Sequence, residues 1–327
     1  MENSISKIAV FTSGGDAPGM NAALRAVVRA AIYYDKEVYG IMRGYEGMID
    51  GELVKLGARS VGNILQRGGT ILKTARSEAF KTPEGRLKAM GSLKKYGIDG
   101  LVAIGGDGTF SGLHHFYVEH KIPSVCIPGT IDNDLAGTDF TIGYDTATNT
   151  AVEAIDKIRD TALSHNRLFF IEVMGRNSGY IAINSGIAGG AIATIIPEES
   201  MTMDELFFLL DEGERNKRKS SLVVVSEGSK LGGALELAKL VADRSSYFDI
   251  KVTILGHLQR GGAPTYFDRV LASKMGVAAI EGLLSGKSDA MVGIRNNKIV
   301  YNLYDTIMSQ HHEIDSELLR IAKILSI

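Results

Sequence analysis

Short apolar runs alternate along the chain with segments of helical periodicity. Residues 8–11, 101–104 and 122–127 are mostly apolar, which is typical of short strands buried on both faces of a parallel sheet. After the first run, apolar residues recur at the spacing of one face of an α-helix: Leu24, Val27, Val28, Ala31 and Ile32. Strand, glycine-containing loop and helix therefore follow one another at 8–33 and again at 101–118, as expected of βα units.

The second half of the chain continues this alternation. The pattern predicts a helix over 148–161, strands over 168–174, 221–226 and 252–255, and then a helix over 266–283 with no new set of strands. Alternating strands and helices are typical of α/β proteins. Because 327 residues exceed one typical domain, we expect two doubly wound lobes with mostly parallel sheets.

Composition narrows the class of protein. Hydrophobic residues make up 45% of the chain and charged residues 23%, as in ordinary globular proteins. The net charge of −2 and the pI near 6.4 argue against a nucleic-acid-binding surface, which would need a basic face. No segment approaches the length of an apolar membrane span, and the N-terminus has no signal-peptide pattern. We therefore expect a cytoplasmic protein with no membrane partner.

The single cysteine, Cys126, lies within the apolar run 122–127. One cysteine cannot form an intramolecular disulfide. Its apolar neighbours predict a buried structural thiol rather than a nucleophile.

Two loops carry the residues with the clearest chemistry. Gly105-Gly-Asp-Gly-Thr109 follows the run 101–104, and Pro128-Gly-Thr-Ile-Asp-Asn-Asp134 follows the run 122–127. Open α/β sheets bind ligands where such loops leave the carboxyl ends of parallel strands. The glycines of the first loop let the backbone approach a phosphate, and its carboxylate can face a magnesium ion. The second loop adds two carboxylates and a hydroxyl, so the pair predicts phosphoryl transfer.

Further motifs make the resemblance to a known family specific. The first loop by itself also resembles the nucleotide loops of NAD kinases and lipid kinases. Four more motifs occur in order along the chain: Ser13-Gly-Gly-Asp-Ala-Pro-Gly-Met-Asn21, Arg67-Gly-Gly-Thr70, Val173-Met-Gly-Arg176 and Leu255-Gly-His-Leu-Gln-Arg-Gly-Gly262. With the two loops they resemble the bacterial-type ATP-dependent 6-phosphofructokinases over roughly residues 8–300. The resemblance implies phosphorylation of D-fructose 6-phosphate to fructose 1,6-bisphosphate by Mg-ATP, the committed step of glycolysis.

The resemblance also implies a role for each matching residue. Asp107 would face the magnesium ion, Asp132 would accept the proton of the sugar's 1-hydroxyl, and Arg176 would neutralise charge on the transferred group. Thr130, also catalytic, and Asp134 would position that end of the sugar, which Ile131 would contact. ATP would be held by Gly14, Tyr45, Arg76, Ser77, Gly106, Asp107, Gly108 and Thr109.

For the sugar's 6-phosphate, the resemblance implies a cationic site shared by two subunits. His257 and Arg260 would come from one chain, and Arg167 and Lys251 from its neighbour. The remaining sugar contacts would come from Met174, Gly175, Arg176 and Glu227. The active form would be a homo-oligomer, at least a dimer and by resemblance a tetramer. Residues 1–142 plus 259–310 would form the ATP-binding lobe and 143–258 plus 311–327 the fructose 6-phosphate lobe, with the site in the cleft between them.

Two glycines predict which phosphoryl donor is used. Relatives that use pyrophosphate carry Asp and Lys at the positions of Gly108 and Gly129, and these larger side chains fill the space that the nucleotide needs. Glycine at both positions favours ATP. Lys251 stands where the family has an Arg, which keeps the charge but loses the planar fork. A kinase for another sugar phosphate, such as sedoheptulose or tagatose phosphate, therefore remains an alternative, as does a weakly catalytic regulatory paralogue.

The family's effector site matches only in part. Arg25, Arg29 and Arg159 match its phosphate-binding arginines. Ile192 replaces the Glu that meets the effector's metal ion, and an apolar side chain cannot coordinate a cation. Further departures are Ala58, Asn63, Tyr180, Asn216 and Arg218. The sequence leaves a retained effector response and an altered or absent one equally open.

Overall fold

The chain folds into two compact units. The computed structural model describes residues 5–163, 167–215, 221–245, 248–308, 310 and 313–326. Unit 1 consists of Met1–Ile131, Leu135–Asp145 and Arg260–His312, and unit 2 of Asp132–Asp134, Thr146–Gln259 and Glu313–Ile327. The predicted lobes have similar boundaries, but they placed Asp132–Asp134 in the first lobe. Which ligand each lobe binds stays a prediction.

Unit 1 is built on a mixed sheet with the strand order β12-β11-β5-β4-β1-β2-β3, in which β6 also pairs with β5. The pairs β2–β3 and β11–β12 are antiparallel, and all others are parallel. The strands are β1 (Lys7–Thr12), β2 (Glu37–Ile41), β3 (Leu53–Leu56), β4 (Gly100–Gly105), β5 (Ser124–Thr130), β6 (Ile142–Gly143), β11 (Ala290–Arg295) and β12 (Lys298–Leu303).

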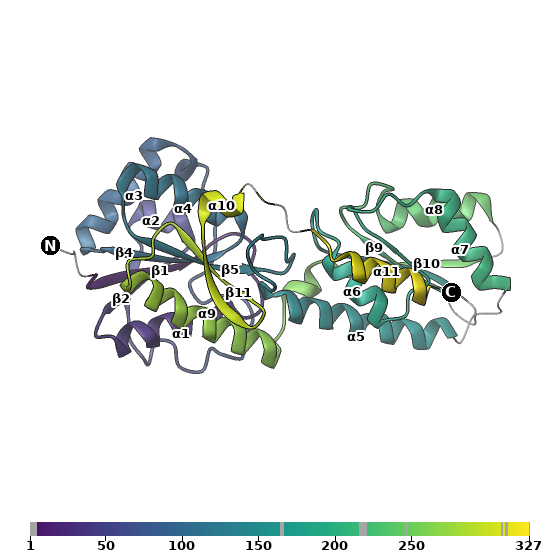
Figure 1. Cartoon of the computed structure of the whole chain (residues 1–327), viewed down its shortest axis with the longest axis horizontal. Coiled ribbons are helices and arrows are strands. Elements are labelled where there is room, and N and C mark those ends of the chain that lie inside the picture. The colour runs from purple at the N-terminus through teal and green to yellow at the C-terminus, as the bar shows by residue number, and fades with distance from the viewer. Residues whose placement is uncertain are drawn as a thin grey trace. The chain divides into compact units, whose positions relative to one another are not determined.

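Helices cover both faces of this sheet (Figure 1). On one face lie α1 (Met20–Tyr33) and α9 (Tyr266–Leu284), which pack against each other. On the other face lie α2 (Gly44–Asp50), α3 (Pro83–Tyr96) and α4 (Asp107–His120), with the short η1 (Ala79–Lys81) and α10 (Tyr304–Met308) nearby in the fold.

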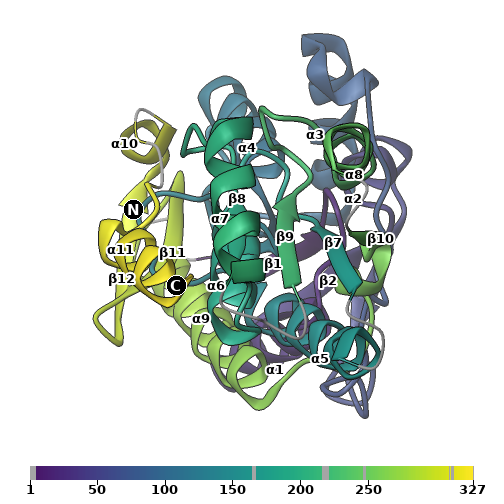
Figure 2. The ribbon, with the colours of Figure 1, turned by 90° about the vertical axis from the view of Figure 1, so that its right-hand side faces the viewer.

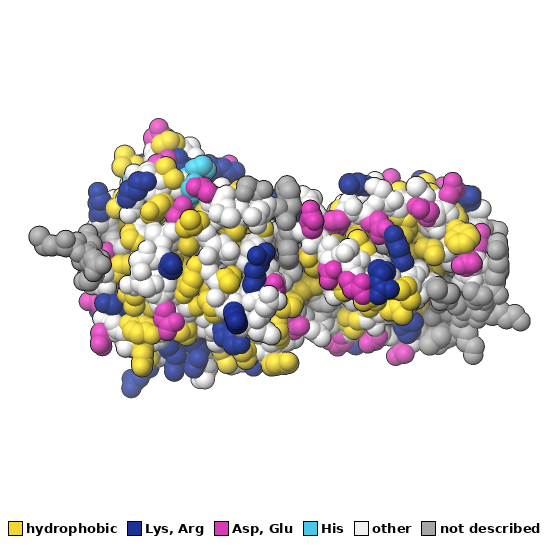
Figure 3. Space-filling view, viewed as in Figure 1, with side chains coloured by type: hydrophobic (Ala, Val, Ile, Leu, Met, Phe, Trp, Pro, Cys, Tyr) yellow, Lys and Arg dark blue, Asp and Glu magenta, His cyan; other side chains and the backbone are white. Residues whose placement is uncertain are grey.

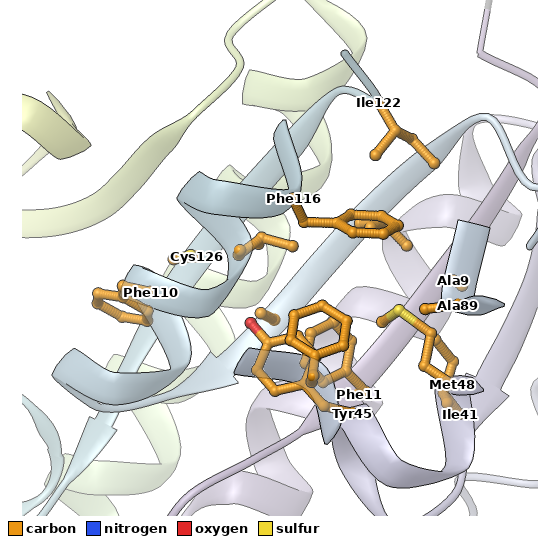
Figure 4. Close-up of a cluster of buried hydrophobic side chains, with 14 of the residues drawn as sticks. Ala9, Phe11, Ile41, Tyr45, Met48, Ala89, Phe110, Phe116, Ile122 and Cys126 are labelled. Carbon is orange, nitrogen blue, oxygen red and sulfur yellow. The ribbon is translucent and has the colours of Figure 1, made fainter. Parts of the chain in front are cut away.

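An aromatic core lies between the sheet and the helices α2, α3 and α4 (Figure 4). Phe11, Phe110 and Phe116 are almost completely buried there, and burial of each such side chain contributes about 1.5–3 kcal/mol. Cys126 is buried among them, as predicted, and burial raises the pKa of its thiol. A thiol held in its protonated form is a poor nucleophile, so Cys126 is a structural residue.

Unit 2 has a four-stranded, fully parallel sheet with the order β10-β7-β9-β8 (Figure 2). The strands are β7 (Arg167–Val173), β8 (Ala193–Ile195), β9 (Ser221–Ser226) and β10 (Asp249–Ile254). The helices α7 (Met203–Arg215) and α8 (Ala234–Arg244) pack on one face. The other elements are α5 (Tyr144–Leu163), α6 (Tyr180–Ala188), η2 (Gly256–Arg260) and α11 (Ser316–Leu325).

The α/β fold with mostly parallel sheets is confirmed, but two details of the prediction are wrong. The run 122–127 does not end at Ile127: β5 continues through Thr130, because β6 pairs with Gly129 and Thr130. The segment after 283 does contain new strands, since β11 and β12 form a hairpin. Its turn residues Asn296 and Asn297 both have positive φ, as a two-residue hairpin turn requires.

The surface carries both signs of charge. Lys and Arg side chains are mixed with Asp and Glu on the face that Figure 3 shows, and pairs such as Arg320–Glu317 and Lys323–Glu199 lie on unit 2. Within the part of the chain that the structure describes, no helix has the length and apolar character needed to cross a membrane.

Candidate active site

The loop after β4 is tightly packed at Gly105 and exposed where it enters α4. Gly105 is the last residue of β4. A Cβ at this position would collide with the Thr109 side chain and would lie 2.6 Å from the carbonyl oxygen of Ser13. Gly106 precedes α4 in an extended conformation, and no side chain caps this helix. The N–H groups of Thr109 and Phe110 donate to the carbonyl of Gly106, at 3.0 and 3.2 Å, whereas the first two N–H groups of the helix, those of Asp107 and Gly108, precede any partner within it. Together with the helix dipole, they make this end of α4 suited to a phosphate.

Asp107 and Gly108 begin α4 and are both exposed. A Cβ at Gly108 would meet no atom within 4 Å, so the space predicted for the nucleotide is open at this position. Gly129 differs from the prediction. A Cβ there would lie 3.1 Å from Ile104 Cγ2 and 3.2 Å from Met20 Cε. Glycine at 129 therefore accommodates packing within the sheet rather than open space.

Tyr45 supports this loop from the core. Its ring stacks on Phe80 at a centroid distance of 3.9 Å and lies 4.9 Å from Phe11, and Figure 4 shows it beneath the helix that carries Phe110. Burial raises the pKa of its hydroxyl, which donates to the backbone oxygen of Thr109 at 2.5 Å. Only 6% of Tyr45 is exposed. Support of the loop is thus visible, while direct contact with ATP stays a prediction.

The loop after β1 lies beside the loop after β4. The N–H of Ser13 donates to the carbonyl of Ile104 at 3.0 Å. Gly14 is exposed, with a φ of 82°, and a Cβ there would lie 3.5 Å from Thr109 Oγ1. Arg260 packs on the same loop, since its Nη1 donates to the backbone oxygen of Asp16 at 3.2 Å. The structure thus brings Gly14, Thr109 and Arg260 into one region of unit 1.

The predicted nucleotide residues Arg76 and Ser77 precede η1. Arg76 is exposed, and Ser77 Oγ accepts from the N–H of Phe80 at 3.2 Å. Arg86 holds the same segment, because its Nη1 donates to the carbonyl of Phe80 at 3.0 Å and its side chain pairs with Glu119. Arg86 is 7% exposed and was not among the predicted site residues.

The two carboxylates predicted for the acceptor side, Asp132 and Asp134, follow β5. Thr130 is its last residue, and its backbone oxygen accepts from Thr141 Oγ1 at 2.7 Å. A Cβ on Gly106 would lie 3.7 Å from Thr130 Cβ, so the two loops are neighbours. Ile131 is completely buried, Asp132 is 7% exposed, and Asp134 is partly buried. Asn133 between the two carboxylates has a φ of 50°, which turns the chain sharply at this point.

In unit 2, the predicted sugar-binding residues lie at the carboxyl end of the sheet. Met174, Gly175 and Arg176 follow β7, Glu227 follows β9, and His257 lies in η2 after β10. Glu227 Oε1 accepts from the N–H groups of both Gly175 and Arg176, at 3.2 and 2.7 Å. The side chains of Arg176 and His257 are exposed.

Arg167 and Lys251 lie at the opposite end of the same sheet. Arg167 opens β7, while Met174 comes after its last residue, so the strand separates the two ends by about 20 Å. Both cations pair with Asp249, from Lys251 Nζ at 2.6 Å and from Arg167 Nε at 2.8 Å. These pairs, with Lys251 first, lower the pKa of the Asp249 carboxyl. Within one chain, Arg167 and Lys251 therefore do not lie at the same end of the sheet as Met174 and Arg176.

The predicted effector residues fall on two units. Arg25 and Arg29 lie on α1, and no ion pair of theirs is found among the described residues. Arg159 lies on α5, where a Cβ at Gly190 would approach its Nη2 to 3.3 Å. Ile192 is 2% exposed within the core of unit 2, so it offers nothing to a metal ion. Ala58 and Asn63 are exposed, Tyr180 donates to the backbone of Glu313, and Asn216 and Arg218 lie outside the described residues.

The donor set at the first loop fits a magnesium ion that arrives with its nucleotide. Across the described ranges, no group of three or more His, Cys, Asp or Glu side chains could hold a metal ion. Magnesium is usually bound by one or two carboxylates together with substrate phosphates and water. The exposed carboxylate of Asp107, at the first turn of α4, suits that arrangement.

The chain is similar to known proteins over almost its whole length. A family model described as phosphofructokinase matches residues 7–283. The chain is 54% identical over 320 residues to the ATP-dependent 6-phosphofructokinase of Cytophaga hutchinsonii, covering 98% of each chain. It is also 54% identical over 321 residues to ATP-dependent 6-phosphofructokinase 1 of Thermus thermophilus, covering 98% of this chain and 99% of the relative.

Solved structures show the same fold. The phosphofructokinase of Saccharomyces cerevisiae superposes with a TM-score of 0.87 at 34% identity, over 93% of this chain and 45% of the yeast chain. This chain therefore spans less than half the length of the yeast subunit. A pyrophosphate-dependent phosphofructokinase from Marinobacter aquaeolei superposes with a TM-score of 0.82 at 21% identity, over 99% of this chain and 92% of that one. At that identity, the likeness concerns the fold alone.

Proposed function

The chain belongs to the phosphofructokinase family, and we propose that it transfers the γ-phosphoryl group of ATP to D-fructose 6-phosphate, giving fructose 1,6-bisphosphate and ADP. The observation that carries this proposal is the adjacency, within unit 1, of the loop after β4 and the end of β5. The first presents the open first turn of α4 and the carboxylate of Asp107, and Gly106 lies close to Thr130, the last residue of β5. Asp132 follows Thr130 by two residues in the sequence, so the chain that passes the phosphate loop also carries the proposed base for the acceptor hydroxyl.

Each residue has a defined task in this reaction. The N–H groups at the start of α4 would bind the phosphates. Asp107 would hold the magnesium ion, which would neutralise charge on the phosphates when bound. Asp132, which is nearly buried, accepts the proton of the 1-hydroxyl. Arg176 stabilises the charge of the transferred group.

Gly108 supports ATP as the donor. A side chain here would project into open space above the first turn of α4, where the rest of the nucleotide would lie. Asp at this position would add negative charge and volume in that space. Gly129 does not add to this argument, because the space beside it is filled by Ile104 and Met20.

The separation of cations within unit 2 supports an oligomeric active form. Arg167 and Lys251 lie at the amino end of the sheet, away from the loops that carry Arg176 and His257. They can reach a sugar phosphate only if they serve the site of a neighbouring copy. We therefore propose a homo-oligomer, at least a dimer and by family resemblance a tetramer. We expect it in the cytoplasm, without nucleic-acid or membrane partners.

The first experiment measures ADP release by the purified protein with magnesium, ATP and fructose 6-phosphate, beside a reaction with pyrophosphate in place of ATP. We expect sugar-dependent turnover with ATP alone. Replacing Asp132→Ser should lower kcat by about 10²–10⁴-fold, the usual contribution of a general base, with sugar binding largely kept. Asp139→Asn is the matched control, because this exposed carboxylate accepts from the N–H of Asn296, in the β11–β12 turn, at 2.7 Å. Unchanged turnover of Asp132→Ser would remove it as the base.

Lys251 gives a reason to check the acceptor sugar. Its ammonium group lacks the fork with which Arg binds a phosphate at two points, and it shares Asp249 with Arg167. The same assay with sedoheptulose and tagatose phosphates compares kcat/KM between sugars. A higher value for either would make it the preferred acceptor. If folded, oligomeric protein showed no turnover with any of these sugars, the result would favour a regulatory paralogue.

The effector response is the least constrained part of the proposal. Arg25, Arg29 and Arg159 supply cations, while Ile192 is buried. We propose that any effector bound there is held through its anionic groups and not through a metal ion on residue 192. Titrating nucleoside diphosphate into the assay with and without excess magnesium tests this. A response that strictly requires the metal would contradict it.

A further inference from the structure

The loop after β7 has an unfavourable backbone conformation that contacts from the rest of the protein must stabilise. Gly175 has a φ of 152° and Arg176 a φ of 54°. A non-glycine residue in such a conformation costs about 1–3 kcal/mol and persists only when its surroundings fix it. The N–H of Ser178 donates to the carbonyl of Gly175 at 2.8 Å and closes the turn. Gly228 lies so close that a Cβ would collide with the carbonyl oxygen of Arg176.

Two side chains take up three consecutive N–H groups of this loop. The N–H of Met174 donates to Gln259 Oε1 at 2.8 Å, while Glu227 Oε1 accepts from Gly175 and Arg176. Glu227 follows β9 and Gln259 follows β10, the two strands that flank β7 in the sheet. The loop of the middle strand is therefore clamped from both sides.

Gln259 differs from Glu227 in being fully buried, with 0% exposure. Because the N–H of Met174 can only donate, the Gln259 atom that faces it is the side-chain oxygen. The other end, Nε2, has no acceptor among the residues that the structure describes. A buried donor without a partner costs about 1–3 kcal/mol. An aliphatic side chain would avoid this penalty but leave the Met174 N–H unpaired, so glutamine offers the fold little net gain.

We propose that Gln259 is a positioning residue for phosphoryl transfer. Its side-chain oxygen fixes the Met174 end of the loop, and the loop fixes Arg176. This rests on the proposed function of Arg176. Gln259 lies between His257 and Arg260 in η2, the segment proposed to bind the 6-phosphate. Its bond to Met174 connects η2 to the loop of Arg176, the residue proposed to stabilise the transferred group. A displacement of about 1 Å in such a group lowers the rate about 10²-fold.

The test compares three variants of the full-length protein. Gln259→Leu removes the acceptor, and Gln259→Glu keeps one. Glu198→Ala is the matched control, because Glu198 Oε1 accepts from the N–H of Gly179 at 2.8 Å, in the same unit but outside the clamped loop. We expect Gln259→Leu to lower kcat about 10- to 100-fold, with much smaller changes in Tm and in the KM for fructose 6-phosphate. Gln259→Glu should recover part of the turnover, and Glu198→Ala should keep kcat.

A double-mutant cycle decides whether Gln259 acts through Arg176. If it does, Gln259→Leu lowers kcat in the wild type but hardly at all in the Arg176→Ala background. An equal loss in both backgrounds, or unchanged kcat in the wild type, would overturn the proposal. Amide hydrogen exchange at Met174, Gly175 and Arg176 should be faster in Gln259→Leu, and unchanged exchange would also overturn it. An inactive wild type would overturn the proposed function instead, and exchange would still decide whether the clamp exists.

Discussion

The loop after β4 and the loop after β7 both leave the carboxyl end of an interior parallel strand, but they are held in different ways. The first rests on the aromatic core through Tyr45 and has no side chain on the N–H groups at the start of α4. The second has three consecutive N–H groups occupied by Gln259 and Glu227.

This difference decides what each loop can offer a ligand. A loop with open N–H groups binds anions through its backbone, so small residues such as Gly106 and Gly108 suit it. A loop whose N–H groups are already bonded must act through a side chain, and Arg176 is the side chain that it presents. Glycine has different uses in the two cases: room for a ligand at Gly108, and room for the protein itself at Gly228.

The largest expected effect separates the side chain of Arg176 from the backbone that carries it. Arg176→Ala and Arg176→Gly should both lower kcat by about 10²–10³-fold, since each removes the stabilising charge. Arg176→Gly should nevertheless be about 1 kcal/mol more stable than Arg176→Ala, because glycine accepts a φ of 54° without strain. Steady-state kinetics and thermal unfolding of both variants check this. Equal stability of the two variants would show that the left-handed backbone is not under strain.

A smaller effect is expected from the first loop. Gly105→Ala should destabilise the protein by about 1–3 kcal/mol and raise the KM for ATP, because its Cβ would collide with Thr109 and Ser13. Gly108→Ala is the matched control: its Cβ meets nothing within 4 Å, so the fold should be unaffected or slightly more stable. Denaturant unfolding and ATP titration measure both. Tolerance of alanine at both positions would mean that the loop can shift, and the contrast with the loop after β7 would weaken.

The smallest effect concerns the far end of β7. Lys251 and Arg167 lower the pKa of Asp249, so its ion pairs stabilise the fold above the ordinary carboxyl pKa of 3.8 and are lost as the pH falls through the lowered value. The Tm of Asp249→Asn should lie slightly below that of the wild type at neutral pH and converge with it in acid. Amide exchange at 174–176 should not change. Faster exchange there would mean that both ends of the strand are coupled.

The sequence allowed much of the fold to be predicted because most central strands are buried on both faces. The strands β1, β4, β7 and β9 appear as mostly apolar runs, and α1 and α9 begin close to the predicted residues. The end of β5 was missed because Pro128 and Gly129 are typical of loops, and the strand that pairs with Gly129 and Thr130, β6, comes a dozen residues later.

The candidate site was predictable where neighbours in sequence are also neighbours in space. Gly106, Asp107, Gly108 and Thr109 lie together for this reason. Gln259 was not recognised, although it lies in the motif 255–262, because the N–H that it binds is 85 residues away. A single sequence likewise gives no sign that Arg167 and Lys251 share Asp249, since that contact depends on the register of β7 and β10.

The clamped loop after β7 also has a consequence for protein engineering. Any side chain at Gly175 would collide with Ser178, and any side chain at Gly228 would collide with Arg176. Loss of Glu227 would leave two N–H groups without their acceptor. Position 176 is the exception, because its side chain is exposed while its backbone is held by others. A saturation library restricted to this codon would therefore vary the chemistry offered to a bound phosphoryl group on an almost constant scaffold.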